Sequence, residues 1–358
     1  MRVLVTGMVA GLNHEEYVQR VLEMGRVEGR EIRHYNLVRD LERTGKKKLD
    51  RLLGATNYLF QVLREREYRK IGYDLLKHDA KDAIIHVPAT IEWNRINIKL
   101  KDHEEIAEYI KPDVVVTLID AEWVIQERLR QTTEQNEFFQ RIKDQNHTIH
   151  EILSWMNEEV SLSEDWANYL DVPHYVIPVN QHPLSLYKLV RDSKVPSFYV
   201  SYSMTHAETA IRSEINKCIK RLTNYGLVID PQAIEIGSNV EDAHEKEAVY
   251  AYTVHRDLHW FVGKVDAVVA IHPYEERPPL STGMMDELGH ARDYLKGRYM
   301  IFPPKNLSPF TTDSYIEKGH VYSGMDDFFK DLESEGFQPY DYPQAVRDVE
   351  WATAIKLE

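Results

Sequence analysis

The chain has 358 residues, of which 43% are hydrophobic and 28% charged, and its formal net charge is −14. This length predicts two domains, each with enough apolar residues for its own core. The acidic excess leaves no broad positive surface for phosphates, which excludes general nucleic-acid binding but not a local pocket for one mononucleotide.

Cysteine content and apolar runs indicate the setting of the protein. Cys218 is the single cysteine, so no internal disulfide forms, which fits a reducing compartment. No apolar stretch reaches the roughly 18 residues that a membrane span needs. The N-terminal MRVLVTG is typical of a first strand and lacks a signal-peptide pattern. We therefore expect a cytoplasmic protein without membrane partners.

The first half of the chain alternates apolar β-branched runs with segments of helical period, which predicts an α/β domain. The strands are expected at residues 2–6, 31–36, 83–87, 113–119 and 174–179. The helices are expected at residues 15–28, 39–77 with a break near Gly54, 122–169 and 183–190.

A polar segment containing Pro196, residues 191–197, predicts a domain boundary, and a second α/β series follows it. Its strands are expected at residues 198–203, 227–229, 267–272 and 299–302, and its helices at 208–224, 247–262, 285–295 and 325–335. The sequence thus predicts two three-layer α/β/α domains with mainly parallel sheets. They cover residues 1–192 and 197–335, and a C-terminal extension covers 336–358.

VLVTGMVAGLNHEE, near the N-terminus, has the strand–glycine turn–helix layout of a phosphate-binding loop. A working loop of the form GxxxxGK[ST] supplies backbone N–H groups, a lysine and a hydroxyl for Mg²⁺. Here Gly7 and Gly11 are one residue too close, Leu12 replaces the lysine, and Asn13 replaces the hydroxyl residue. Gly7, Gly11 and Asn13 are expected to contact a nucleotide, unless this is an ordinary turn.

The first half also contains AIIHVPATIEWN and EYIKPDVVVTLIDAEWVIQERLRQ. With the glycine loop, these segments resemble the archaeal-type adenylate kinases, which are P-loop nucleotide kinases, over about residues 1–190. The resemblance implies a P-loop-kinase-like fold in which a bound nucleotide is possible. Because the lysine is missing, we expect no phosphoryl transfer. The side chains that either line this site or are ordinary surface charges are His86, Asp120, Arg128 and Arg130.

Several motifs of the second half occur together in a fixed order. They are Asp257-Leu258-His259-Trp260, then Val265-Asp266-Ala267-Val268-Val269-Ala270, then Gly283, and then Glu287-Leu288-Gly289-His290-Ala291. With the preceding YVSYSMTH, they resemble the nucleoside 2-deoxyribosyltransferases and the 2′-deoxynucleoside 5′-monophosphate N-glycosidases. The resemblance covers about residues 198–303 and implies that Glu287 is the nucleophile and Asp257 the second acid.

The chemistry of N-glycosidic bond cleavage suits two carboxylates. Positive charge builds at C1′ as the base departs, and a carboxylate beneath C1′ stabilises this charge and can bond to the carbon. A second acidic group can orient or protonate the base. Glu287 is expected in the first turn of a helix, where the dipole favours its ionised form. The alternatives are a stabilising helix-start charge for Glu287 and an ordinary helix residue for Asp257.

The loop before Glu287 suggests the substrate. Hydroxyls and helix-start N–H groups bind phosphate, and a glycine admits a sugar close to the backbone. Ser281, Thr282 and Gly283 stand where the monophosphate glycosidases of this family have such groups. Further candidates for substrate binding are Tyr202, Ser203, His206 and Arg212. We therefore expect a small-molecule partner, a (deoxy)nucleoside 5′-monophosphate.

Three other functions stay open: a nucleotide kinase with an atypical loop, an NAD-type glycohydrolase, and a non-catalytic nucleotide sensor. We expect no cofactor except a possible nucleotide in the first domain. No metal site is expected either, because His255 and His259 have helical spacing but no obvious third ligand. The resemblance implies a homo-oligomer.

Overall fold

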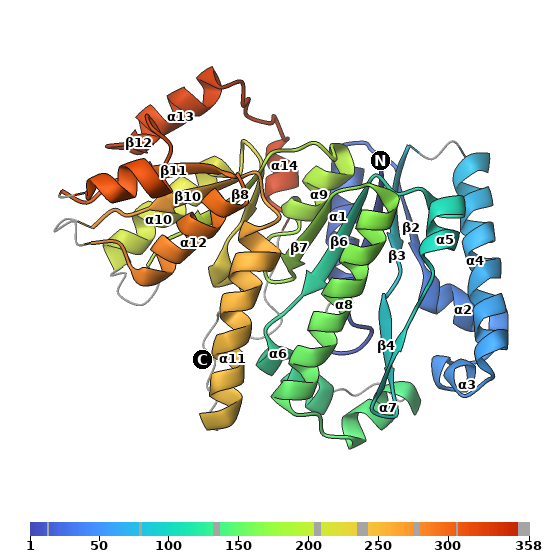
Figure 1. Ribbon diagram of the computed structural model, residues 1–358. Coiled ribbons are helices and arrows are strands. Elements are labelled where there is room, and N and C mark those ends of the chain that lie inside the picture. The colour runs from blue at the N-terminus through green and yellow to red at the C-terminus, as the bar shows by residue number, and fades with distance from the viewer. Residues whose placement is uncertain are drawn as a thin grey trace. The chain divides into compact units, whose positions relative to one another are not determined.

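The structure, a computed structural model, describes residues 1–12, 14–78, 81–131, 137–203, 209–234, 243–274, 279–305 and 307–349. The chain forms two compact units (Figure 1). Unit 1 comprises Met1–Ser193, Ala233–Tyr250 and Pro343–Glu358, and unit 2 comprises Lys194–Gln232 and Ala251–Tyr342. Each unit has a five-stranded parallel sheet, which confirms the predicted α/β class.

The sheet of unit 1 has the strand order β2-β3-β1-β6-β7, and all its neighbouring strands are parallel. The strands are β1 (Arg2–Thr6), β2 (Ile32–Asn36), β3 (Asp82–His86), β6 (Val114–Ile119) and β7 (His174–Pro178). After β1 the chain builds β2 and β3 on one side, and then β6 and β7 on the other. Such a reversal leaves a crevice at the carboxyl ends of the central strands, where ligands of α/β proteins bind.

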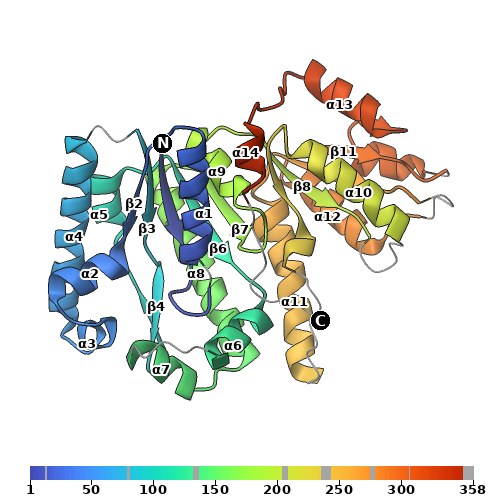
Figure 2. The same cartoon turned by 180° about the vertical axis from the view of Figure 1, so that it is seen from behind.

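Helices cover both faces of this sheet, so β3 and β6 are buried along their whole length. Helices α1 (His14–Val27) and α9 (Leu184–Arg191) pack together on one face, seen in front in Figure 2. Helix α8 (Ile149–Leu170) packs on the other face, against β6 and β7. The remaining helices of this part are α2 (Leu37–Gly45), α3 (Leu49–Leu53), α4 (Asn57–Lys77), α5 (His103–Glu105), η1 (Ile106–Ile110), α6 (Glu122–Gln131), α7 (Glu137–Asp144) and α14 (Gln344–Arg347).

A small antiparallel hairpin, β4 (Thr90–Trp93) and β5 (Ile96–Lys99), follows β3 and was not expected from the sequence. Its two-residue turn consists of Asn94 and Arg95, both with positive φ (52° and 60°). Two successive residues of positive φ match the twist of a tight hairpin, but Arg is an unusual choice for the second. The sequence therefore lacks the glycine that ordinarily marks such a turn.

A buried carboxylate joins the ends of β1 and β3. Glu159 of α8 is 1% exposed, and its Oε1 accepts hydrogen bonds from the backbone N–H groups of Gly7 and Ala89, each at 2.8 Å. Its Oε2 accepts from the backbone N–H and the hydroxyl of Thr90, both at 2.7 Å. All four contacts are donors, so they suit an ionised carboxylate. Glu159 therefore fixes the glycine loop to the hairpin.

The sheet of unit 2 has the order β12-β11-β10-β8-β9 and is also parallel. Its strands are β8 (Ser197–Ser201), β9 (Leu227–Ile229), β10 (Ala267–Ile271), β11 (Gly297–Ile301) and β12 (Val321–Tyr322). The chain builds β9 on one side of β8 and then β10 on the other. The reversal therefore places the crevice at the carboxyl ends of β8 and β10.

The helices of unit 2 form two layers. Helices α10 (Thr209–Leu222) and α13 (Met325–Ser334) contribute to the core on one face. On the other face, α12 (Thr282–Asp293) packs against β10, β11 and the π-helical segment η3 (Arg256–Val262). Segment η3 continues from α11 (Ala243–His255), of which the residues up to Tyr250 belong to unit 1. Two short helical segments, η2 (Pro231–Ala233) and η4 (Thr311–Tyr315), complete the list of helices. Across the described residues, no helix combines the length and apolarity needed to cross a membrane.

Replacing Glu159 tests whether its carboxylate holds the glycine loop and the hairpin together. Glu159→Gln keeps the shape but puts an NH₂ group against backbone N–H donors, so we expect the free energy of unfolding to fall by about 3 kcal/mol. The amide protons of Gly7, Ala89 and Thr90 should also lose protection in hydrogen exchange. Asp165→Asn, an exposed change on the same helix, is the control. Unchanged protection in Glu159→Gln would contradict this role.

Candidate functional site

The carboxyl end of β8 in unit 2 carries two hydroxyl groups on one face. Tyr199 and Ser201 are two residues apart, so their side chains point to the same side of the sheet, toward α12. The Tyr199 hydroxyl donates to Oε1 of Glu287 at 2.7 Å, and the Ser201 hydroxyl donates to Oε2. The carboxylate of Glu287 is thus held by both oxygens at the strand reversal.

The start of α12 differs from the sequence prediction. Ser281 is the N-cap, so the helix begins at Thr282 and not at residue 285. Glu287 therefore lies in the second turn, and the expected support from a first-turn position is wrong. The hydroxyls of β8 provide the stabilising donors instead.

Asp257 lies on η3, which packs against α12. Its carboxylate accepts from Nε of Arg256 at 2.9 Å, and the side chains are 12% and 2% exposed, respectively. The guanidinium of Arg256 lies 5.7 Å from the ring centre of Phe261. The ring centres of Phe261 and Tyr199 are 6.3 Å apart. The second predicted carboxylate is therefore a buried ion-pair partner, connected to Glu287 through two aromatic rings.

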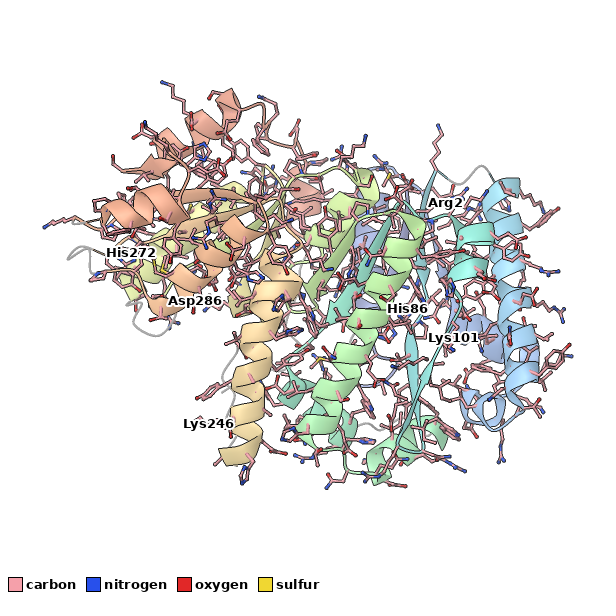
Figure 3. The ribbon with its side chains drawn as sticks, in the orientation of Figure 1. Arg2, His86, Lys101, Lys246, His272 and Asp286 are labelled. Atoms are coloured by element: carbon pink, nitrogen blue, oxygen red, sulfur yellow. The ribbon has the colours of Figure 1, made fainter. Side chains whose placement is uncertain are left out.

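The predicted substrate-binding residues before Glu287 lie at the N-terminus of α12. Ser281 accepts from the N–H of Met284 at 3.3 Å, and Thr282 and Gly283 are exposed in the first turn. Among the described residues, and apart from its chain neighbours and its own helix backbone, no heavy atom lies within 4 Å of a Cβ built on Gly283. Figure 3 shows His272 at the carboxyl end of β10 and Asp286 on α12.

The residues after β8 divide between the core and the surface. Tyr202 packs in the core with α10, and its hydroxyl donates to Asp230 at 2.7 Å, so its ring joins the face opposite Glu287. Ser203 is half-buried, and its carbonyl accepts from the hydroxyl of Tyr274 at 3.1 Å. Arg212 is exposed on α10, and His206 lies outside the described residues.

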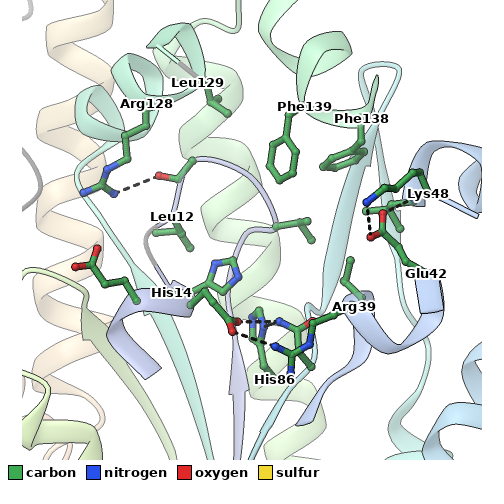
Figure 4. A pocket seen from close by; sticks show the side chains of 17 residues that line it. Leu12, His14, Arg39, Glu42, Lys48, His86, Arg128, Leu129, Phe138 and Phe139 are labelled. Atoms are coloured by element: carbon green, nitrogen blue, oxygen red, sulfur yellow. Dashed lines mark hydrogen bonds and ion pairs between the residues drawn. The ribbon is translucent and has the colours of Figure 1, made fainter. Parts of the chain in front are cut away.

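Unit 1 has a cavity of about 740 Å³ at the carboxyl edge of its sheet (Figure 4). Gly11, Leu12 and His14 line it after β1, and Asn36 and Arg39 line it after β2. Its other lining residues are Val9, Glu15, Glu16, Val38, Glu42, Lys48, Leu49, His86, Arg128, Leu129, Phe138 and Phe139. Its place at the strand reversal and its mixed charged and aromatic wall suit a mononucleotide-sized ligand.

Arg128 is fixed at the edge of this cavity. Its Nη1 donates to the carbonyl of Gly11 at 3.2 Å and to the buried carboxylate of Asp120 at 2.6 Å. Burial raises the pKa of Asp120, although Arg128 opposes that effect. Of the predicted nucleotide contacts, Gly11, Arg128 and His86 line the cavity, whereas Gly7 donates its N–H to Glu159. Arg130 is exposed outside the lining, and Asn13 lies outside the described residues.

Histidine and carboxylate side chains gather at the base of the cavity. The rings of His14 and His86 lie 4.2 Å apart between centroids. Nδ2 of Asn36 contacts Nδ1 of His86 at 3.2 Å and Oε2 of Glu15 at 3.1 Å. Burial lowers the pKa of His14 to about 4 and that of His86 well below its usual range. Both imidazoles are therefore neutral near pH 7.

No protein-family model matches the chain, and no curated protein matches it.

Sequence reasoning missed Tyr199 and Arg256 in unit 2 and Asn36, Arg39 and Phe138 in the cavity of unit 1. Alternation along β8 was a usable signal for Tyr199, since polar groups at 199 and 201 interrupt one face of a buried strand. The missed cavity residues carry no such local pattern, because they lie at the end of β2 and in helices that follow β2 and β6.

The Asp257–Arg256 pair yields a test of burial. Asp257→Asn removes the charge of a carboxylate that accepts from a buried guanidinium, so we expect the free energy of unfolding of unit 2 to fall by about 3 kcal/mol. The control is Asp293→Asn, because Arg292–Asp293 is a neighbouring pair with the same order but with side chains 44% and 60% exposed. Its loss should cost less than about 1 kcal/mol. Equal effects of the two changes on urea unfolding would contradict this account.

Proposed function

We propose that unit 2 breaks the N-glycosidic bond of a (deoxy)nucleoside 5′-monophosphate, with Glu287 as the nucleophile. The observation that carries the proposal is the pair of hydroxyl groups on β8 that hold both oxygens of this carboxylate at the strand reversal. The motifs that resemble the deoxyribosyltransferases and monophosphate glycosidases support the same role.

In the proposed reaction, each of the named side chains has one role. An oxygen of Glu287 attacks C1′ as the bond to the base breaks; the base keeps the bonding electrons and takes up a proton from water. Water, or a second base, then attacks C1′ and releases Glu287, giving hydrolysis or transfer. The donors Tyr199 and Ser201 fix the carboxylate so that little reorganisation is needed. Arg256 favours the ionised form of Asp257, which suits an acceptor that orients the base better than a proton donor.

The start of α12 is our candidate for the phosphate end of the substrate. Thr282 and Gly283 are exposed there with their backbone N–H groups, and the first turn contains no acidic residue. Helix N-termini bind phosphate through such N–H groups and the helix dipole. Glu287, one turn further along, then lies within reach of the sugar. This arrangement favours a 5′-monophosphate over a free nucleoside.

The nucleophile has a direct test. Glu287→Gln should lower the rate of free-base release by at least about 1,000-fold, because the amide cannot form the glycosyl ester. Chromatography of a panel of nucleosides, nucleotides and NAD measures the release. Asp286→Asn, an exposed change in the preceding residue, is the matched control and should keep its rate. An unchanged rate in Glu287→Gln would remove this residue from the reaction.

The hydroxyl donors make a separate prediction. Tyr199→Phe and Ser201→Ala each remove one hydrogen bond to Glu287 but leave the nucleophile in place. We expect kcat to fall by about 10- to 100-fold, because the carboxylate loses its orientation, with little change in KM. Full activity in the double variant would show that the donors do not position Glu287.

A second candidate function belongs to unit 1, where the 740 Å³ cavity favours nucleotide binding. Leu12 lines this cavity at the position of the phosphate-loop lysine, so we propose binding without phosphoryl transfer. ADP formation from ATP and a monophosphate acceptor would instead support a kinase, and tight binding without any product would support a sensor.

A further inference from the structure

Three side chains with metal-binding atoms meet at the base of the unit 1 cavity. His14 and Glu15 begin α1, and His86 ends β3, which pairs with the strand preceding α1. One ligand atom of each residue lies within 4.8 Å of those of the other two. Two donors bound at about 2.1 Å to a tetrahedral ion are roughly 3.4 Å apart, so small side-chain shifts bring the three together.

Two of these donors have no other hydrogen-bonding role in the part of the chain that the structure describes. Nε2 of His86 and Nδ1 of His14 are buried without a hydrogen-bond partner there. His86 is 2% exposed and lines the cavity, as Figure 4 shows. Buried polar atoms without partners are uncommon and require a ligand or another explanation. Neutral imidazoles are also the form that binds metal.

We infer that His14, Glu15 and His86 bind a divalent first-row transition-metal ion such as Zn²⁺ at the base of the cavity. Two imidazoles and one carboxylate are a donor set that such ions prefer, whereas Mg²⁺ and Ca²⁺ prefer oxygen alone. Three protein ligands leave at least one coordination position for water or for a ligand in the cavity. This site is independent of the proposed chemistry at Glu287.

Asn36 contacts Nδ1 of His86, the ring nitrogen that does not bind the metal, and so influences this site. Its Oδ1 accepts from the N–H of Arg39 at 3.0 Å, so its NH₂ group faces Nδ1 of His86. When a metal binds Nε2 of the neutral His86 ring, Nδ1 carries the proton and becomes a donor. The amide of Asn36 must then turn its oxygen toward His86, and it loses the hydrogen bond that caps α2. An aspartate at this position accepts from both groups without turning, but it loses the hydrogen bond to Oε2 of Glu15 and puts a second carboxylate beside that ligand. A carboxylate behind a ligating histidine also strengthens the bond to the metal.

Metal binding to the chelator-treated full chain tests the site. We expect one Zn²⁺ ion to bind in calorimetry, and Co²⁺ to give visible absorption bands of nitrogen and oxygen ligands, with no comparable binding of Mg²⁺. His14→Ala and Glu15→Gln should each weaken Zn²⁺ binding at least tenfold. Glu23→Gln, which changes a partly exposed carboxylate further along α1 and outside the cavity lining, is the control.

The variants separate this site from adventitious binding, since the chain has 16 histidines. Zn²⁺ binding that is equal in the wild type and the His14→Ala/Glu15→Gln double variant would overturn the inference, provided that circular dichroism shows both folded. Binding of inorganic phosphate at these residues without metal would identify an anion site instead and contradict the proposal.

Discussion

A carboxylate that leaves bulk water needs hydrogen-bond donors, and this requirement shapes the carboxyl edge of both sheets. In unit 1, Glu159 uses four donors from the loops after β1 and β3. In unit 2, Glu287 uses two hydroxyls on one face of β8. The first carboxylate has no remaining acceptor capacity and is structural. The second is held at the strand reversal by Tyr199 and Ser201, and this orientation is the basis of its proposed role.

The two units use the same topology differently. Each parallel sheet reverses its strand order once, so each has one crevice at its carboxyl edge. In unit 1 this edge has a cavity with Leu12 at the position of a phosphate-binding lysine. In unit 2 it has an oriented carboxylate at the reversal. We propose that the crevice of unit 1 binds a nucleotide and that the crevice of unit 2 is the site of glycosidic bond cleavage.

Most of the fold was predictable, because its parallel strands are continuous apolar runs separated by helices with a clear period. The hairpin after β3 was missed because Asn94 and Arg95 form its turn without glycine. The long helical region before β3 breaks after Gly45 and again near Gly54, and only the second break was predicted. The first break is fixed by Lys46 in a left-handed conformation, which its sequence does not indicate.

The candidate sites were predictable only in part. Glu287 came from the order of several motifs, but its partner Tyr199 is 88 residues away, and no local pattern gives such a contact. The expected first-turn position failed because the N-cap is Ser281 and the helix starts earlier. His14, Glu15 and His86 were not grouped, since two begin a helix and the third ends a strand that neighbours β1 only in the folded sheet.

The proposed reaction passes through a covalent bond between Glu287 and C1′ of a sugar phosphate. Mass spectrometry of peptic peptides, from the protein quenched in acid during turnover of a deoxynucleoside 5′-monophosphate, tests it most directly. We expect a deoxyribose-phosphate adduct on the peptide that contains Glu287 and none in the glutamine variant. Release of free base with no adduct on that peptide, or an adduct on another residue, would contradict it.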